Sequence, residues 1–433
     1  MTDPMMLFIT VGLLLILLAM GTKIAWALGL AGMAMSVVIF GWENGLRMIG
    51  TICYDRGTSF AMTCMPLFIF MGEMMMRSGM NDVVFDGMGK LTKGVPGGIL
   101  QTTIGTSAAF AASCGSSVAC TATVAAVAYP ALVKRGYPRA FSACTIATGG
   151  TLGILIPPSM QFIIYASLVG ESVSKLFIAG IMPGLMLATM FCIYIAIRAL
   201  AQPHLFPPRE HFNFVENLSG LAAMWPIAIL IFLVLITMYI GVATPTEAAA
   251  FGAVGSIFLT FFYQRKGFFK LLYEGALATL RTTSMIMFLI IGASILTFIL
   301  THLRLTDYVL NGIMQYGLSP LIVFLMVCVV YIILGMFLDA VSMMVLSLPV
   351  LYPVMTHLGF NGIWFGVIVV LWLEVAFLTP PFCMGLFILS GISKVPMDEL
   401  IPDIFPYLGI FVIAIALMYT FPGICLWLVS MMK

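Results

Sequence analysis

Two pairs of adjacent prolines, Pro157-Pro158 and Pro380-Pro381, interrupt apolar segments of this 433-residue chain, one pair in each half. A proline has no backbone N–H, so within a helix it leaves the carbonyl four residues earlier without a donor. The carbonyls affected are those of Gly153, Ile154, Ala376 and Phe377. An unpaired buried oxygen is costly unless water or a cation satisfies it. These oxygen-rich, sulfur-poor breaks predict ligation of a small hard cation such as sodium.

Two other apolar stretches are interrupted by polar or small residues that could form the opposite wall of each site. The first interruption runs from Ser113 to Ser117, and the second contains Asp339 and Ser342. Helix N-termini attract anions, and hydroxyl oxygens also ligate cations. An ionised Asp in a membrane interior costs about 2.5–3.5 kcal/mol, which favours a cation partner or an aqueous cavity. Close helix packing is the alternative role for the small residues.

Three further acids lie in or beside apolar segments. Glu374 lies about one turn before the second break, and Glu73 lies in an early apolar segment. Each is either a site residue or a paired interior acid. Glu247 follows Thr244 and is interpreted as an acid of a helix-capping region. None of the four histidines or nine cysteines has a spacing that indicates metal binding or catalysis.

The composition indicates whether these residues lie in water or in a lipid bilayer. The chain is 62% hydrophobic and 8% charged, with a mean hydropathy of +1.14, which is too apolar for a soluble globule of this length. We therefore predict an integral membrane protein in a lipid bilayer. The net charge of +2 says nothing about nucleic acid, and since the sequence has no basic, aromatic stripe we expect no nucleic-acid partner. The first apolar run lacks a cleavage site and is expected to be retained.

Hydropathy divides the chain into about ten membrane crossings and two interrupted stretches. The predicted crossings are residues 5–21, 24–41, 60–77, 139–169, 176–200, 222–242, 246–263, 284–300, 362–392 and 404–430. The two interrupted stretches, 98–132 and 321–356, are predicted to be re-entrant helical hairpins with buried tips. Segments 78–97 and 264–283 alternate charge with apolar residues and predict amphipathic arms, with ordinary loops as the alternative.

The predicted fold is an all-α integral membrane protein built from two inverted repeats, each with about five transmembrane helices and one re-entrant hairpin. The first repeat, 1–201, comprises scaffold helices 1–97, hairpin 98–132, broken helix 139–169 and helix 176–200. A linker, 202–221, leads to the second repeat, 222–433. That repeat comprises scaffold helices and arm 222–300, hairpin 321–356, broken helix 362–392 and helix 404–430.

An ungapped superposition of the two halves that places Pro157 on Pro380 supports the duplication. The same register places Tyr129-Pro130 on Tyr352-Pro353 and Pro183 on Pro406. An odd number of crossings in each half turns the second copy upside down. Most basic residues of the connections fall at one set of helix ends, which predicts that both termini face outward.

With these residues assembled, the chain resembles the large membrane subunit of tripartite ATP-independent periplasmic (TRAP) transporters over nearly its whole length. The stretches that carry the resemblance are Pro66 to Glu73, Gly115 to Ala119, Lys134 to Tyr137, Gly149 to Ser159, Ala179 to Gly184, Thr244 to Ala249 and Leu378 to Pro381. The resemblance implies an elevator-type secondary carrier for organic acids, driven by sodium, in a bacterial inner membrane. It also implies two partners, a periplasmic substrate-binding protein and a small four-helix membrane subunit.

Several residues depart from the pattern of the family. Cys114 stands where the first tip usually has Ser, and Ala340 stands where Pro usually follows the Asp of the second tip. Cys383 and Gly385 replace a usual Gly and Asn. The first ion site therefore carries over more fully than the second.

The resulting hypothesis is sodium-coupled, binding-protein-dependent import of a small organic anion, such as a C4-dicarboxylate or sialic acid. The first sodium site would comprise Ser113, Ser116, Ser117, Gly149, Thr151 and Gly153. The second would comprise Asp339, Ser342, Ala376 and Thr379. The anion would lie near Ser116, Pro157, Ser159, Pro381 and Gly385.

Two alternatives remain at this point. One is a self-sufficient carrier resembling the divalent anion/sodium symporters, which share the plan of hairpins and broken helices. The other is an intramembrane hydrolase using Ser116 or Ser117. The hydrolase is disfavoured because no His or Lys in the neighbouring apolar segments could activate a serine.

Overall fold

The computed structural model describes residues 3–208, 219–220, 222, 224–381 and 383–432, and its regular elements are helices. The first half contains α1 (Asp3–Ala19), α2 (Ile24–Phe40), α3 (Trp42–Gly57), η1 (Phe60–Thr63), α4 (Cys64–Arg77), α5 (Met80–Leu91), α6 (Ile99–Cys114), α7 (Ser117–Lys134), α8 (Arg139–Leu155), α9 (Met160–Val169) and α10 (Val173–Ala201). The short η2 (Pro203–Leu205) begins the predicted linker, of which 209–218 and 221 lie outside the described residues.

The second half is also built from helices. It contains α12 (Trp225–Tyr239), α13 (Pro245–Tyr263), α14 (Phe268–His302), α15 (Leu305–Gln315), α16 (Pro320–Gly335), α17 (Ala340–His357), α18 (Gly362–Leu378), α19 (Met384–Ser393), α20 (Met397–Thr420) and α21 (Gly423–Ser430). The register that superimposes the two proline pairs carries α7 onto α17 and α8 onto α18 with identical ends. The same register places α9 one residue from α19.

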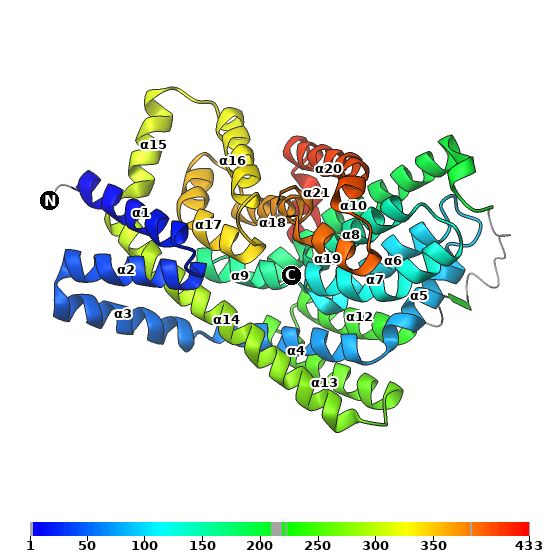
Figure 1. Ribbon diagram of the computed structural model, residues 1–433. Coiled ribbons are helices and arrows are strands. Elements are labelled where there is room, and N and C mark those ends of the chain that lie inside the picture. Colours follow the sequence, from blue (N-terminus) through cyan, green and yellow to red (C-terminus); the bar gives the residue numbers. More distant parts are fainter. Residues whose placement is uncertain (1–2, 209–218, 221, 223, 382, 433) are drawn as a thin grey trace.

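Corresponding helices also pack crosswise between the halves. Helix α2 packs on α14 while α4 packs on α13, and α7 packs on α19 while α17 packs on α9. Figure 1 shows α14 running obliquely from the end of the molecule that holds α1, α2 and α3 towards α4 and α13. The contact of α2 with α14 is close, since a Cβ at Gly292 would lie 2.8 Å from the Ala25 carbonyl oxygen. Small residues permit such an approach of membrane helices.

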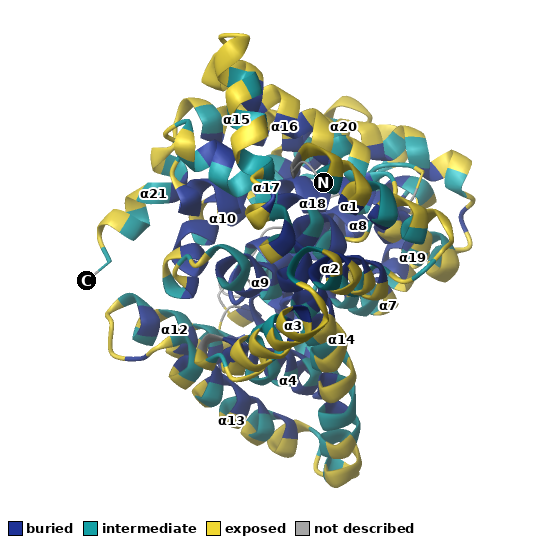
Figure 2. Cartoon of the chain, turned by 90° about the vertical axis from the view of Figure 1, so that its left-hand side faces the viewer, coloured by how far each residue is buried: buried dark blue, intermediate teal, exposed yellow. Residues whose placement is uncertain are grey.

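Helices α8 and α18 form the buried centre of the protein. Every residue of α8 from Phe141 to Leu155 is buried, as is every residue of α18 except Phe377. Both helices are apolar or small on all sides, which is typical of a helix enclosed by others. In Figure 2 the buried residues gather in the middle of the molecule, and exposed residues cover outer elements such as α15.

Both central helices end just before a proline pair. Helix α8 ends at Leu155 and bends by 42° into α9, while α18 ends at Leu378 and is followed by α19. Both Pro-Pro peptide bonds are cis. The breaks follow from the sequence because proline neither donates the helical hydrogen bond nor tolerates a helical residue before it. The predicted broken helices, 139–169 and 362–392, thus correspond to α8–α9 and α18–α19.

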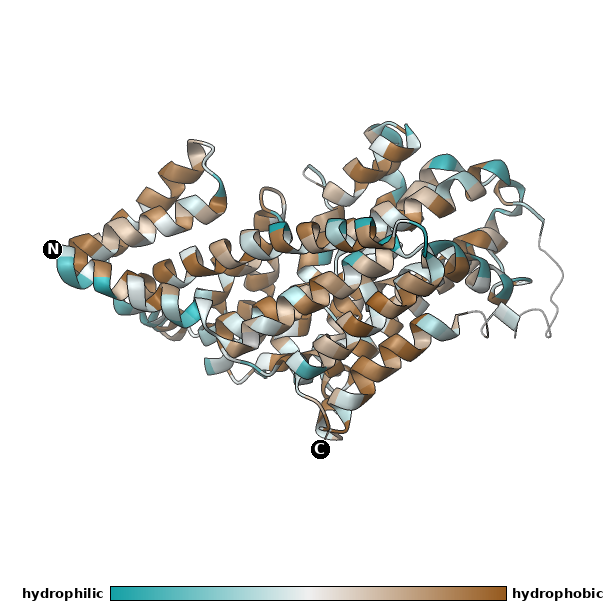
Figure 3. Cartoon of the chain, turned by 90° about the horizontal axis from the view of Figure 1, so that it is seen from below, coloured by the Kyte–Doolittle hydropathy of each residue, from teal (hydrophilic) through white to brown (hydrophobic). Residues whose placement is uncertain are grey.

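The apolar helices suit a membrane. Among the described residues, six helices are long and apolar enough to cross a bilayer, or seven if α8 and α9 form one span, and six shorter apolar helices have 10–17 residues. Figure 3 shows hydrophobic residues along most helices and hydrophilic ones concentrated near helix ends and connections. The protein is therefore an all-helical, multi-pass membrane protein.

Three sequence predictions need correction. The predicted arm 264–283 is continuous with the crossing 284–300, because no proline or glycine cluster separates them, and both belong to the 35-residue α14. The predicted helix 404–430 instead starts at Met397 and is interrupted near Pro422 between α20 and α21. Helices α3 and α15 were not expected, because their charged residues lower the mean hydropathy of each segment.

Candidate ion and substrate site

The first hairpin turns sharply at its tip. Helix α6 ends at Cys114, and Gly115 adopts a left-handed conformation with φ of 61° that favours glycine. Ser116 then caps α7 by accepting a hydrogen bond from the Ala119 N–H at 3.4 Å. The first tip therefore consists of a glycine turn followed by the N-terminus of α7.

This first tip packs directly on the first proline break. A Cβ at Gly153 would lie 3.0 Å from the Ser116 carbonyl oxygen, and a Cβ at Gly115 would lie 3.1 Å from the Pro158 carbonyl oxygen. At both positions a side chain would crowd the facing carbonyl, so glycine eases this approach of tip and broken helix. Ser116 and Gly153, two of the residues predicted to share the first sodium site, are thus brought into contact from the tip and from α8.

The chemistry of the first site fits a small hard cation. The Ser113 hydroxyl donates to the Phe110 carbonyl at 2.9 Å, and the Thr151 hydroxyl donates to the Thr148 carbonyl at 2.5 Å. Both bonds use the hydroxyl proton and leave oxygen lone pairs for a cation. Gly149 lies against the buried Ser107 hydroxyl, which has no hydrogen-bond partner among the described residues. Such oxygen donors suit sodium.

Of the four carbonyls predicted to lose their helical donor, two accept a hydrogen bond from another group within the described part of the chain and two do not. The Ser159 hydroxyl donates to the Ile154 carbonyl, and the Thr379 N–H donates to the Ala376 carbonyl at 3.3 Å. No donor to Gly153 or Phe377 is seen among the described residues. The prediction of four open oxygens was therefore too broad, because neighbouring polar groups bend back to satisfy two of them.

The second tip is organised by one carboxylate. Asp339 caps α17 by accepting hydrogen bonds from the N–H groups of Val341 and Ser342, at 3.1 and 3.3 Å, and from the Ser342 hydroxyl. Asp339 is exposed, whereas the residues of the first site are mostly buried. The second tip therefore offers a charged ligand in an open position.

The second site is less closely assembled than the first. Ala376 packs against Gly335 at the end of α16, and the Thr379 hydroxyl donates to the Val375 carbonyl at 2.7 Å. Within the described chain, no hydrogen bond joins Asp339 or Ser342 to Thr379. The four predicted ligands thus form two separate pairs.

The predicted substrate residues lie at unequal depths. Ser116 is half-buried, Pro157 and Ser159 are buried, and Pro381 is exposed. The Ser159 hydroxyl also accepts a hydrogen bond from the Phe162 N–H and so caps α9. The Phe377 ring covers Gly385, because a Cβ there would overlap with that ring. Ser116 and Pro381 are therefore the more accessible candidates.

Comparison with known families supports a transport role for this arrangement. A model described as "Tripartite ATP-independent periplasmic transporter, DctM component" matches residues 11–424. The chain belongs to the DctM family of TRAP transporters. This family consists of transport permeases, so the chain is not an enzyme and the hydrolase alternative is set aside.

Relatives of this DctM component carry different acids. The chain is 31% identical over 401 residues to the C4-dicarboxylate TRAP transporter large permease protein DctM of Pseudomonas aeruginosa, which covers 92% of this chain and 93% of that protein. It is 30% identical over 405 residues to the 2,3-diketo-L-gulonate TRAP transporter large permease protein YiaN of Escherichia coli, covering 93% and 94%. It is 29% identical to the isethionate TRAP transporter permease protein DctMQ of Oleidesulfovibrio alaskensis, covering 95% and 64%.

A solved structure has the same fold at low sequence identity. The Alcanivorax borkumensis YdaH transporter superimposes with a TM-score of 0.63 at 14% identity, covering 88% of this chain and 90% of that one. At this identity the likeness concerns the fold alone. The helical architecture of this DctM component is thus one that another transporter also uses.

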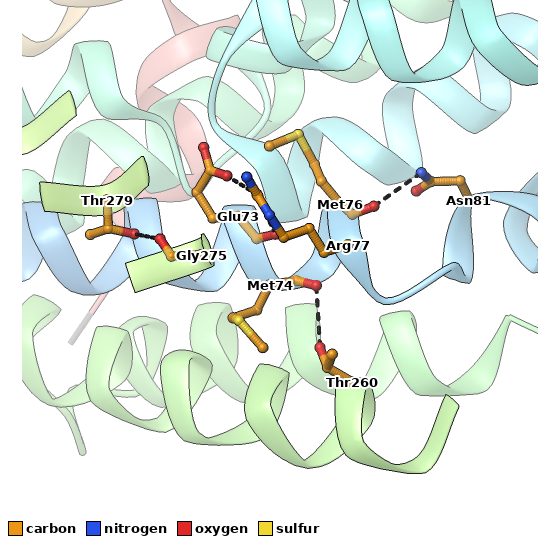
Figure 4. A network of polar contacts seen from close by, with 8 residues as sticks. All are labelled: Glu73, Met74, Met76, Arg77, Asn81, Thr260, Gly275 and Thr279. Atoms are coloured by element: carbon orange, nitrogen blue, oxygen red, sulfur yellow. Dashed lines mark hydrogen bonds and ion pairs between the residues drawn. The ribbon is translucent and has the colours of Figure 1, made fainter. Parts of the chain in front are cut away.

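Two acids that the sequence left open have partners in the structure. The Ser117 hydroxyl donates to Glu374 Oε1 at 2.6 Å, although the residues are 257 positions apart. Glu73 pairs with Arg77 one turn later on α4 (Figure 4). In the same view the Thr260 hydroxyl of α13 donates to the Met74 carbonyl at 3.2 Å. Glu374 was recognisable from its place before the second break, but its partner was not.

Helix α4 also touches the first tip. A Cβ at Gly72 would lie 2.9 Å from the Cys114 carbonyl oxygen and 3.1 Å from that of Ser113. Gly72 therefore permits close contact between a helix of the predicted scaffold and the hairpin tip.

Proposed function

We propose that this DctM component imports a small organic anion across the bacterial inner membrane, coupled to sodium, in a complex with a periplasmic substrate-binding protein and a small four-helix membrane subunit. The observation that carries the proposal is the direct packing of the first tip, between α6 and α7, on the first break, at the end of α8, in a region that is rich in oxygen atoms. Carriers built from repeats place their substrate and ions at such broken helices.

The chemistry of the relatives supports an anionic substrate. The relatives named for C4-dicarboxylates, diketogulonate and isethionate are named for acids that are anionic at neutral pH. The N-terminus of α7 at the first tip and a bound cation would both attract such a charge. Sodium near the tips would therefore create part of the binding site for the anion.

We further propose that the halves are inverted repeats and that the hairpins and broken helices move together as an elevator against the remaining helices. The coincident ends of α7 with α17 and of α8 with α18 in one register support the repeats. Two related hydrogen bonds agree with this register. Tyr129 donates to the Ser393 carbonyl, while its counterpart Tyr352 donates to the Glu171 side chain, one residue beyond the position that corresponds to Ser393.

Uptake by the reconstituted complex tests the coupling. Liposomes holding this chain and its small subunit, supplied with loaded binding protein, should accumulate the radiolabelled anion in a sodium gradient. Replacing sodium by choline should abolish accumulation, and sodium-independent uptake would refute the coupling. Omitting both the binding protein and the small subunit tests the remaining alternative, because uptake by this chain alone would identify a self-sufficient symporter.

A further inference from the structure

Glu374 is a fully buried carboxylate at the contact between the two halves. Its relative exposure is 0%, and it lies on α18 one turn before the second break. Its Oε1 accepts the hydrogen bond from Ser117 of the first tip at 2.6 Å. One residue of the second half is thus attached to a residue predicted to ligate the first sodium ion.

The other oxygen of this carboxylate lacks a partner. Glu374 Oε2 is buried and has no hydrogen-bond partner among the described residues. None of the ion pairs found among those residues includes Glu374. Burying a lone carboxylate is costly unless a cation or proton compensates its charge. The hydroxyl of Ser117 satisfies one oxygen but brings no positive charge. A cation or a proton must therefore compensate the charge at this position.

The pair does not arise from the internal repeat. In the register that superimposes the two proline pairs, Ser117 corresponds to Ala340 and Glu374 corresponds to Thr151. The equivalent pair in the other half would join a methyl group to a hydroxyl and could not bind a cation. The acid thus belongs to one site, and packing symmetry does not explain it.

We infer that Glu374 is an anionic sodium ligand, binding the ion with Ser117 at the first tip. The inference deepens the proposed function, on which it rests, by adding a charged residue to a site otherwise built from neutral oxygens. Binding of sodium would then connect the first hairpin to α18, and so to the second half. A carboxylate ligand also binds a hard cation more strongly than hydroxyls alone.

Sodium-dependent unfolding of the purified full chain in detergent tests this role without transport. Sodium chloride is titrated at constant ionic strength with choline chloride, and the melting temperature is followed by tryptophan fluorescence. The wild type should be stabilised by sodium. Glu374→Gln should raise the half-saturating sodium concentration by about tenfold or more. Glu171→Gln, which alters the acid that accepts a bond from Tyr352, should keep the wild-type value.

The competing occupant of Glu374 is a proton, which the glutamine variant imitates. Wild-type sodium dependence in Glu374→Gln would therefore refute the inference. If that variant does not fold, Ser117→Ala replaces it, since it keeps the acid but removes its hydroxyl partner. An unchanged half-saturating concentration in Ser117→Ala would then refute the inference.

The same data separate this inference from the proposed function. Sodium-dependent uptake by the wild type, combined with normal sodium binding by Glu374→Gln, would reject the role of Glu374 alone. Absence of any sodium effect on wild-type melting and uptake would reject both.

Discussion

The two tip-and-break regions share one backbone plan but differ in how they are assembled. In the first, Ser116 and Gly115 lie against Gly153 and Pro158, and the surrounding residues are buried. In the second, Asp339 is exposed and its hydrogen bonds remain within its own tip. In the first region the tip and the break meet by close packing, whereas the second tip is organised by one exposed charge.

If the halves are repeats, as proposed, this contrast shows how two copies can diverge while both keep a tip and a break. Gly153 corresponds to Ala376 when the proline pairs are superimposed, so the close contact of the first half cannot be copied in the second. There the glycine lies on the partner helix, as Gly335 against Ala376. The glycine of this contact thus lies on the broken helix in the first half and on the hairpin arm α16 in the second, and the hairpin meets the broken helix differently in the two halves.

The largest expected effect comes from separating the first tip from its break. Gly153→Val would place a branched side chain against the Ser116 carbonyl, where even a Cβ lies at 3.0 Å. We expect destabilisation of about 1–3 kcal/mol and uptake reduced to background. Thermal unfolding and reconstituted uptake measure the two effects. Gly391→Val is the control, because a Cβ at Gly391 meets nothing within 4 Å. Normal uptake by Gly153→Val would show that the first site does not need this contact.

Features fixed by local chemistry were predictable from the sequence. The two proline pairs that lie within apolar segments, Pro157-Pro158 and Pro380-Pro381, each end a helix, so both breaks followed from the sequence. The hairpin arms followed from polar residues in the middle of apolar stretches. Helix α3 escaped prediction because Glu43, Arg47 and Arg56 make its segment too polar for a hydropathy criterion.

Features that depend on distant packing could not be predicted. The bond between Ser117 and Glu374 joins residues 257 positions apart, and no local pattern pairs them. Nor could the sequence indicate that Ser159 would satisfy the Ile154 carbonyl, since this depends on how α9 leaves the break. Tip and break were expected together because both occur in each half, but their unequal contact was not.

An intermediate effect is expected from removing the charge of the second tip. Asp339→Asn retains the cap of α17, because Asn caps helices as well as Asp does. Melting without sodium should therefore stay near the wild-type value, while the sodium concentration for half-maximal uptake should rise by about tenfold. Asp339→Ala separates the roles, since losing the cap costs about 1 kcal/mol. Unchanged sodium dependence in Asp339→Asn would remove this residue from the site.

The smallest effects come from two threonines with similar bonds in the two regions. Thr151 donates to the Thr148 carbonyl at 2.5 Å, and Thr379 donates to the Val375 carbonyl at 2.7 Å. Thr151→Val and Thr379→Val should each cost about 1 kcal/mol of stability, because each leaves one carbonyl without that donor. A change in sodium affinity beyond this loss of stability would then be due to the removal of the threonine hydroxyl oxygen as a sodium ligand.

We expect Thr151→Val to raise the half-saturating sodium concentration more than Thr379→Val. Thr151 is completely buried within the region where tip and break touch, whereas Thr379 is half-buried and not bonded to its tip. Sodium-dependent melting of the two variants, compared at equal loss of stability, measures the difference. A larger shift for Thr379→Val would contradict this expectation. Sodium binding in the second region would then depend more on a threonine oxygen than sodium binding in the first region does.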